Sequence, residues 1–282
     1  HQGITTEVCG NCGASAAPVS SFEHLPSDWA DKTYPKIWST MAEYRGLVEE
    51  RGVGINIVNL VGHNTLRRST IGYENRPATA DELTRMTCEL EESMEAGARG
   101  FTTGLVYAPG MFAPRDELVT LARAAAKHDG IYGSHLRSEG DTLLAAIEET
   151  MAIGRAADMR VQVSHLKVSG RGNWDKVDDA LTLIRDARDR GEPVAADRYP
   201  YTAGATDLDV VFPEWAAEGG REAVLARLED SASYDRLRSE LIDSRDEEDW
   251  GGVLVGSTTA ADNERFRGLS LVDVAVLLEL PH

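Results

Sequence analysis

Short apolar β-type runs and amphipathic helical runs alternate along most of the chain, and this alternation is the strongest constraint on its fold. Each β-type run is rich in Val and Ile or flanked by Gly, without clean alternation of apolar and polar residues. Strands that are buried on both faces have this pattern. The helical runs between them predict βαβ units and therefore a parallel sheet. The β-type runs are 3–9, 52–63, 97–107, 130–135, 159–165 and 192–201.

Residues at the ends of the helical runs support this interpretation. Thr79 and Glu82 have the spacing of a capping box at the start of one helix, and Gly97 follows the end of that helix. Asp141 is the expected N-cap of a later helix, and Gly191 is expected to end the next one. The predicted helices therefore connect consecutive strands.

After Tyr201 the pattern changes, and we predict a division of the chain into three parts. Residues 1–212 hold the alternating strands and helices. Residues 213–250 are highly charged and helical, and are interpreted as an inserted helical segment. Residues 251–282 are expected to return in part to the first domain, with a strand at 251–257.

The chain has 47 acidic and 29 basic residues among 282, a formal net charge of −18. This balance argues against a nucleic-acid partner, which needs a basic face, and against adhesion to anionic membranes. No apolar run of the sequence approaches the length of a membrane span. Five of the basic residues are lysines. An acidic, lysine-poor composition is expected either of a halophile's protein, soluble at high salt, or of a high-GC genome.

The number of cysteines bears on the compartment. Three cysteines, an odd number in a long chain, argue against a disulfide scaffold and for a reducing compartment. No basic segment followed by an apolar stretch opens the sequence, although it begins with His1 rather than Met. We therefore expect a cytoplasmic protein.

Nearly every predicted strand ends in a residue that can take part in chemistry. These residues are Cys12, His63, Tyr107, His135, His165 with Lys167, and Asp197 with Tyr199. In a parallel α/β barrel, the carboxyl ends of the strands face the active site. A lone His at a strand end is more often structural, but six such strand ends in register predict a functional site.

Two of these strand ends share the sequence Ser-His-Leu, in GSHLR (133–137) and VSHLK (163–167). They lie about one βα unit apart, which places the imidazoles of His135 and His165 on one face of the sheet. Cysteine and histidine are the ligands that zinc prefers. Zinc in an open site lowers the pKa of its water to about 7 and polarises a carbonyl, so the pattern favours hydrolysis.

Cys9 and Cys12 form a C-x-x-C with several possible roles. A thioredoxin-type pair needs a helix directly after it, and no helical pattern follows Gly13. A zinc knuckle needs a second ligand pair nearby, but Cys88 stands alone in a helical run. We favour Cys12 as a single ligand and Cys9 as a buried apolar residue, while a redox pair and a structural pair stay open.

Six motifs occur in the order found in a known enzyme family. They are QGITTEVCGNCGASAAP, LVGHNTLR, GARGFTTGLVYAPG, SHLRSEGD, VQVSHLKVSGRGNW and DRYPYTAGAT. Over most of residues 2–206 the chain thus resembles the N-acyl-D-amino-acid deacylases, or D-aminoacylases, of the amidohydrolase superfamily. The resemblance implies a distorted (β/α)8 TIM-like barrel, a small β-sandwich built from the chain termini, and one tightly bound Zn²⁺.

The resemblance also implies the roles of individual residues. The family's tight zinc ligands match Cys12, His135 and His165. Tyr107 matches a tyrosine that donates to the substrate's carbonyl oxygen, and Lys167 and Tyr199 match residues that bind its free carboxylate. The implied activity is zinc-dependent hydrolysis of the amide bond of a small molecule, an N-acyl-D-amino acid.

Two features of that family are missing from the sequence: the H-x-H pair of the first barrel strand, and the S-D-G motif whose aspartate is the general base on the last strand. We therefore expect a barrel that is incomplete at both ends, a general base outside this chain, and a fragment rather than a degenerate protein. The alternatives are another amidohydrolase of the dihydroorotase or hydantoinase type, and an inactive barrel that serves as a binding module. Lys167 favours a substrate with a free carboxylate.

Overall fold

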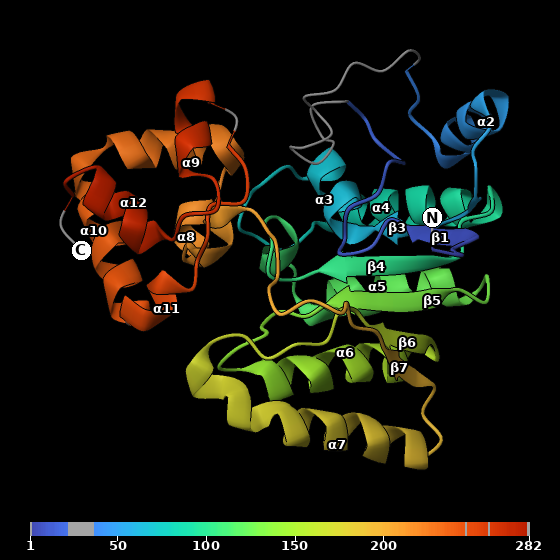
Figure 1. Ribbon diagram of the computed structural model, residues 1–282. Coiled ribbons are helices and arrows are strands. Elements are labelled where there is room, and N and C mark those ends of the chain that lie inside the picture. The colour runs from blue at the N-terminus through green and yellow to red at the C-terminus, as the bar shows by residue number, and fades with distance from the viewer. Residues whose placement is uncertain (1, 22–36, 246, 259, 281–282) are drawn as a thin grey trace.

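The computed structural model describes residues 2–21, 37–245, 247–258 and 260–280 (Figure 1). Its strands are β1 (Thr6–Cys9), β2 (Asn56–Asn59), β3 (Val61–Gly62), β4 (Gly100–Gly104), β5 (Ile131–His135), β6 (Arg160–Val163) and β7 (Val194–Ala196). β1 pairs with β2, and the remaining strands form a five-stranded sheet in the order β3-β4-β5-β6-β7. Every pairing between these strands is parallel.

Each of the six predicted β-type runs contains a strand, so the prediction of an α/β fold with a parallel sheet is confirmed. The run 52–63 is divided in two, because β2 pairs with β1 whereas β3 pairs with β4, and Leu60 lies between them. Within the described ranges the strands make two parallel sheets. The (β/α)8 TIM-like barrel, incomplete at both ends, stays a prediction.

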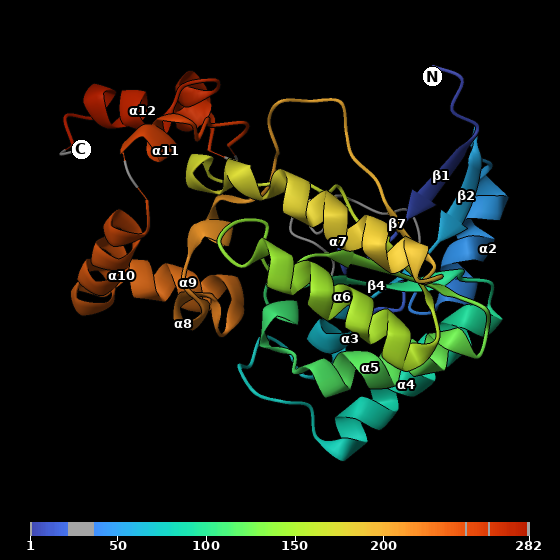
Figure 2. The same cartoon turned by 90° about the horizontal axis from the view of Figure 1, so that it is seen from below.

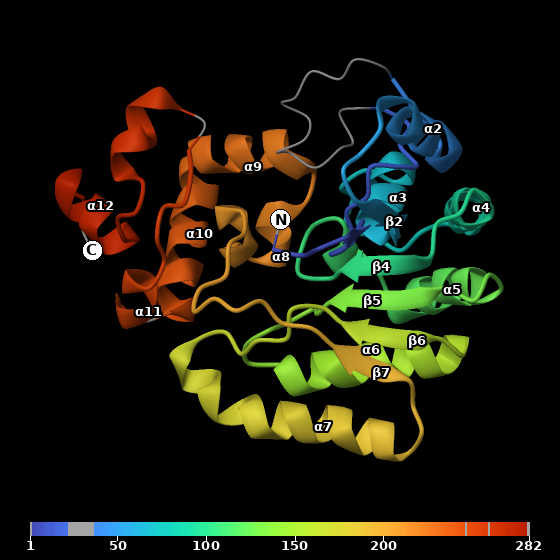
Figure 3. The ribbon, with the colours of Figure 1, turned by 45° about the vertical axis from the view of Figure 1, so that its right-hand side comes forward.

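Helices connect the strands. They are α2 (Met41–Arg51), α3 (His63–Thr70), α4 (Ala80–Glu95), α5 (Arg115–Ala126), α6 (Leu143–Ala157) and α7 (Val177–Asp189), with short 3-10 turns η2 (Gly110–Phe112) and η3 (Arg171–Lys176). Helices α4 to α7 pack side by side in chain order and follow the curve of the sheet on its outer side (Figure 3). These helices therefore cover one face of the sheet, and the candidate site described below lies on the side that they do not cover.

The predicted ends of two helices have different outcomes. The capping box at the start of α4 is present, with the Thr79 side chain accepting from the Glu82 backbone N–H. Asp141 is not the N-cap of α6; that position is taken by Thr142, without a side-chain hydrogen bond. The prediction for Asp141 was wrong because its carboxylate instead accepts a 2.9 Å hydrogen bond from Asn173, which lies in η3.

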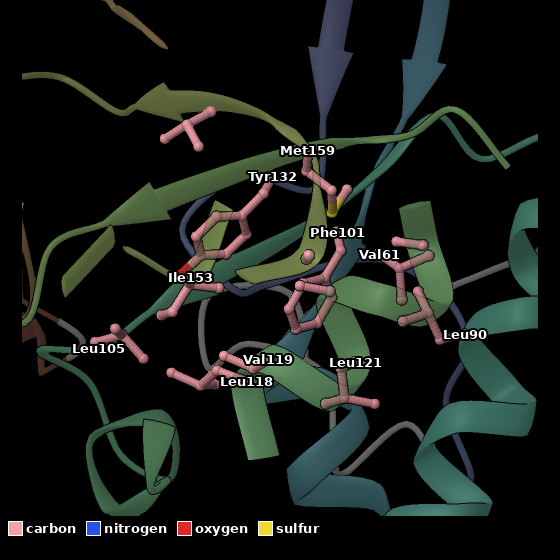
Figure 4. Packing of buried hydrophobic residues seen from close by; sticks show 14 of the residues in the cluster. Val61, Leu90, Phe101, Leu105, Leu118, Val119, Leu121, Tyr132, Ile153 and Met159 are labelled. Carbon is pink, nitrogen blue, oxygen red and sulfur yellow. The ribbon is translucent and has the colours of Figure 1, made fainter. Parts of the chain in front are cut away.

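The core lies between the sheet and the helices (Figure 4). Phe101 of β4 and Tyr132 of β5 are partners in register, and their rings stack with centroids 5.9 Å apart. Leu118 and Leu121 of α5 belong to the same cluster and are fully buried. Burying each such side chain contributes about 1.5–3 kcal/mol. Because side chains alternate along a strand, anchoring this face of β5 leaves His135 on the other face.

Residues beyond β7 form a group of helices beside the sheet (Figures 1 and 2). They are η4 (Leu208–Val211), α8 (Glu214–Ala217), α9 (Gly220–Glu229), α10 (Ser231–Ser244), α11 (Glu247–Gly251), η5 (Ala261–Phe266) and α12 (Leu271–Leu277). The strand predicted at 251–257 is not formed: Leu254 makes a single antiparallel bridge to Ser270, just before α12. That segment is instead held by antiparallel contacts with the residues at the start of α12: the Val255 N–H donates to the Leu269 carbonyl, and the Leu271 N–H donates to the Val253 carbonyl. The three-part division stays a prediction.

No helix in the described part of the chain combines the length and apolar character needed to cross a membrane.

Candidate metal centre

The carboxyl ends of the central strands lie on one side of the molecule, where the arrows of β4, β5 and β6 point (Figure 3). His135 is the last residue of β5, and His165 follows β6 by two residues. Cys12 lies in the turn after β1. The parallel register, in which Gly104 of β4 is the partner of His135, brings these strand ends to a common level.

Close backbone packing holds the Cys12 turn against the end of β4. A Cβ on Gly104 would lie only 2.1 Å from the carbonyl oxygen of Cys12, so only glycine allows this approach. Cys12 itself has a φ of 55°, and Gly13 one of 75°. The amide of Thr65, in α3, donates to the carbonyl of Gly13 over 3.2 Å. The turn that presents the thiol is thus fixed from two sides.

The structure brings Cys12, His135 and His165 together. One donor atom from each of the three lies within 4.8 Å of the others. The Cys12 Sγ is 3.2 Å from His165 Nε2, and the two imidazole rings have centroids 4.3 Å apart. Zinc bonds of about 2.0–2.3 Å are compatible with ligand atoms at such separations.

One buried atom favours a metal at this position. The Nδ1 of His135 is buried and has no hydrogen-bond partner among the described residues, and the His135 side chain is 7% exposed. A buried nitrogen without a partner is costly unless another group binds it. A thiol with two imidazoles is a donor set that zinc prefers, so the residues present fit the ion.

The two histidines differ in their proton affinity. Burial lowers the pKa of His135 to about 4. Burial alone would also lower the pKa of His165, but hydrogen bonds with Cys12 and Glu139 raise it to about 9. At neutral pH His165 therefore carries a proton that a metal must displace, and metal affinity should fall as the pH falls.

Glu139 lies at the centre of the charged groups around the two rings. Its Oε1 is 3.4 Å from His135 Nε2 and 3.3 Å from His165 Nδ1, and it also accepts from the ammonium of Lys167. Burial would raise the pKa of Glu139, but His165, His135 and Lys167 together lower it. The structure thus places Glu139, four residues past His135, in contact with both histidines.

Tyr107, Lys167 and Tyr199 surround the same place. The ring of Tyr107 lies 4.8 Å from that of His135, and its hydroxyl is 3.0 Å from Thr206 Oγ1. Burial raises the pKa of Tyr107 to about 12, so this hydroxyl keeps its proton at neutral pH. The Lys167 ammonium lies 5.8 Å from the centre of the Tyr199 ring. All six residues proposed from the sequence therefore lie around one point.

Two other strand-end residues have structural roles. His63 is fully buried, and its Nε2 lies 2.8 Å from Glu117, which also binds Arg67. Asp197 accepts a hydrogen bond from the backbone N–H of His165, not from its ring. Its other carboxylate oxygen accepts from the Gln162 side chain over 2.8 Å, so Asp197 fixes the chain at His165.

Asn64 is a positioning residue that sequence reasoning missed. Its side chain donates to the carbonyls of Gly104 (3.0 Å) and Tyr107 (3.3 Å) and accepts from the Gly104 amide. It therefore ties the end of β4 to the turn that carries Tyr107. The available signal in the sequence is a polar residue directly after His63, at a strand end.

Comparisons with known proteins agree with this arrangement. No family model matches the sequence. The chain is 38% identical to D-aminoacylase from Alcaligenes xylosoxydans xylosoxydans over 208 residues, which are 73% of this chain and 43% of that protein. It is 39% identical to N-acyl-D-glutamate deacylase from the same organism over 215 residues, 76% of this chain and 43% of that protein.

A solved structure extends the similarity to nearly the whole chain. N-acyl-D-glutamate deacylase from Bordetella bronchiseptica, crystallised with zinc and a phosphonate mimic of the tetrahedral intermediate, matches with a TM-score of 0.78 at 32% identity. The match covers 99% of this chain and 51% of that one. This chain spans about half the length of the relatives that it matches. On this evidence it belongs with the D-aminoacylases and N-acyl-D-amino-acid deacylases of the amidohydrolase superfamily.

Proposed function

We propose that this chain is the metal-binding part of a zinc-dependent N-acyl-D-amino-acid deacylase, which hydrolyses the amide to a carboxylate and a D-amino acid. The observation that carries the proposal is the convergence of Cys12, His135 and His165, from three separate strand ends, to within 4.8 Å. The relatives named above support the substrate class.

The proposed ligands are Cys12, His135 and His165. A bound zinc ion supplies Lewis-acid polarisation of the amide carbonyl. The Tyr107 hydroxyl, which keeps its proton because its pKa is about 12, donates to the carbonyl oxygen as negative charge develops there. A zinc ion is proposed rather than another metal because the donor set includes a thiol, and because the similar bacterial structure contains zinc.

Lys167 and Tyr199 bind the free carboxylate of the substrate in this proposal. Lys167 is two residues past His165, and its ammonium lies 3.2 Å from His165 Nδ1. A cation at that place fixes the end of the substrate opposite the acyl group. Tyr199, whose ring lies 6.4 Å from that of His165, borders the proposed carboxylate site beside Lys167.

Hydrolysis also requires a group that accepts a proton from water, and a positioned carboxylate contributes about 10²–10⁴-fold. Among the described residues Glu139 is close to the site, but it is held by two imidazoles and an ammonium. We therefore propose that the base comes from outside these 282 residues, within a protein of the relatives' length, and that the (β/α)8 barrel is complete there. We also propose a cytoplasmic location, from the free cysteines.

The test has two parts. Zinc titrated into the metal-free chain should bind with one-to-one stoichiometry. A protein of the relatives' length that contains this chain should release D-amino acids from N-acetyl-D-glutamate, N-acetyl-D-aspartate or a neutral N-acetyl-D-amino acid, and should leave the L-enantiomers intact. Lack of zinc binding, or hydrolysis without preference for the D-enantiomer, would contradict the proposal.

A further inference from the structure

One carboxylate oxygen contacts both proposed histidine ligands. Oε1 of Glu139 lies 3.4 Å from His135 Nε2 and 3.3 Å from His165 Nδ1, although the two rings come from different strands. A carboxylate has about four lone-pair directions, two on each oxygen, which is enough for both imidazoles and Lys167 when Oε2 shares the three donors that converge on Oε1. The Glu139 side chain is 14% exposed, so these contacts are largely shielded from water.

Each imidazole therefore directs one ring nitrogen toward Glu139, and its second nitrogen does not contact Glu139. The other nitrogen of His165, Nε2, lies 3.2 Å from Cys12 Sγ. The other nitrogen of His135, Nδ1, is buried without a hydrogen-bond partner among the described residues. The nitrogens that do not face Glu139 are therefore the ones left for a metal.

The loop that carries Glu139 is itself held in place. The backbone N–H of Ser169 donates to the Glu139 carbonyl over 2.6 Å, which joins the loop after β5 to the loop after β6. Asn173 and Lys176, both in η3 after that second loop, donate to the carboxylate and to the backbone carbonyl of Asp141. Exposed ion pairs contribute little energy and have no fixed geometry. The hydrogen bonds that hold this loop instead give Glu139 a fixed position.

Because Lys167 lies beside His165, the position of Glu139 determines which ring nitrogen of His165 keeps its proton. The Lys167 ammonium lies 3.2 Å from His165 Nδ1 and would donate to that nitrogen if nothing else accepted its proton. The ring proton would then lie on Nε2, toward Cys12, where it would block a metal. With Glu139 accepting from both Lys167 and Nδ1–H, the proton on Nδ1 stays in place, and a metal displaces the one on Nε2.

We propose that Glu139 is the positioning residue of the metal centre: it fixes the ring orientation and tautomer of both His135 and His165, and holds Lys167 beside them. The inference rests on the metal site proposed above. Hydrogen bonds of this kind orient a ligand and raise its basicity, and their loss typically costs about 10–100-fold in metal affinity.

The first experiment measures zinc affinity of the metal-free 282-residue chain by competition with a chromophoric chelator. Glu139→Ala should bind zinc about 10–100-fold more weakly than the wild-type chain. Glu139→Gln keeps an accepting oxygen but no charge, so its loss should be smaller. The matched control is Glu148→Ala, which removes a half-exposed carboxylate paired with Arg155 and should change the affinity by no more than about threefold.

The second experiment reads the tautomers directly, by long-range ¹H–¹⁵N NMR of the imidazoles in the zinc-loaded chain. In the wild type, His135 should bind through Nδ1 and His165 through Nε2, and the two remaining N–H protons should exchange slowly with water. In Glu139→Ala both protons should exchange rapidly, while the circular dichroism spectrum remains that of the folded chain.

The outcomes separate this inference from the proposed function. If the wild-type chain binds no zinc, the metal site itself is wrong. If the wild type binds zinc but Glu139→Ala binds it equally well, the positioning role of Glu139 is overturned. Coordination of His165 through Nδ1, or of His135 through Nε2, would overturn it as well.

Discussion

The thiol of Cys12 and the imidazole of His165 are in contact, with Sγ 3.2 Å from Nε2, although 153 residues separate them in the chain. Cys12 follows β1 and His165 follows β6, and these strands belong to different sheets. The contact exists because the strands are parallel and in chain order, so that their carboxyl ends meet on one side. A metal shared by the two residues would cross-link the first and the fifth β-type runs.

Replacing Cys12 should abolish tight zinc binding, whereas replacing Cys9 should not. Cys12→Ala removes one of three converging donors, and metal affinity depends steeply on the number of ligands. Cys9 lies in β1, where burial raises the pKa of its thiol and favours the uncharged form. Equilibrium dialysis with metal analysis should show about one zinc per chain for Cys9→Ala and close to none for Cys12→Ala. Equal loss in both variants would instead point to a two-cysteine site.

Lys167→Ala should weaken binding of the substrate's carboxylate in a protein of the relatives' length. A charged hydrogen bond contributes about 1.5–3 kcal/mol, so KM should rise by about tenfold or more. The matched control is an N-acyl amine without the carboxylate, whose slower hydrolysis should be the same in both enzymes. An unchanged KM for N-acyl-D-amino acids would assign the carboxylate site to other residues.

Gly104→Ala should displace the Cys12 turn. The new Cβ would meet the Cys12 carbonyl oxygen at 2.1 Å, and backbone cannot yield as a flexible side chain does. Overpacking of this kind typically costs about 1–3 kcal/mol of stability, and zinc affinity should fall with it.

Gly133→Ala, on the neighbouring strand, is the matched control for this change. Its nearest contact would be the Thr102 methyl at 3.3 Å, which needs only a small adjustment. Thermal unfolding and zinc titration of both variants provide the comparison. Similar behaviour of the two variants would mean that the close approach at Gly104 does not position Cys12.

The buried cluster of His63, Arg67 and Glu117 should make the fold sensitive to acid. Glu117 is 3% exposed and binds Arg67 at 2.6 Å. Burial would raise the pKa of Glu117, but His63 and Arg67 lower it below its ordinary 4.5. The folded chain thus binds this proton more weakly than the unfolded chain. The stabilisation is fully present above pH 4.5 and is lost as the pH falls through the folded-state pKa.

Glu117→Gln should therefore lower the free energy of unfolding at pH 7 by about 3–5 kcal/mol, because it leaves a buried guanidinium without its charge partner. The difference from wild type should shrink as the pH is lowered below 4.5. Urea unfolding at several pH values measures both quantities. A difference that grows in acid would show that the folded chain binds the Glu117 proton more tightly than the unfolded chain does, opposite to the assigned direction of the pKa shift.

Much of the site could be located from the sequence because its residues occupy positions defined by local pattern. A strand end is recognisable from a β-type run and the helix signals that follow, and His135 and His165 both occupy such ends. The capping box at Thr79 was readable for the same reason, since its hydrogen bonds join residues three apart. The predicted N-cap Asp141 failed because a distant residue, Asn173, competes for its carboxylate.

The sequence by itself determined the order of the strands, their parallel direction and the chemical types at their ends, because these follow from short-range periodicity and composition. Only the tertiary structure decided which atoms meet. Glu139 is four residues from His135 but 26 from His165, and its contact with both depends on the register of β5 and β6 and on the anchoring of two loops. Asn64 acts through hydrogen bonds of 3.0–3.3 Å, and Gly104 through a backbone approach in which a Cβ would lie 2.1 Å from the Cys12 carbonyl oxygen. Such distances come from packing across the whole sheet, which no local pattern of residues encodes.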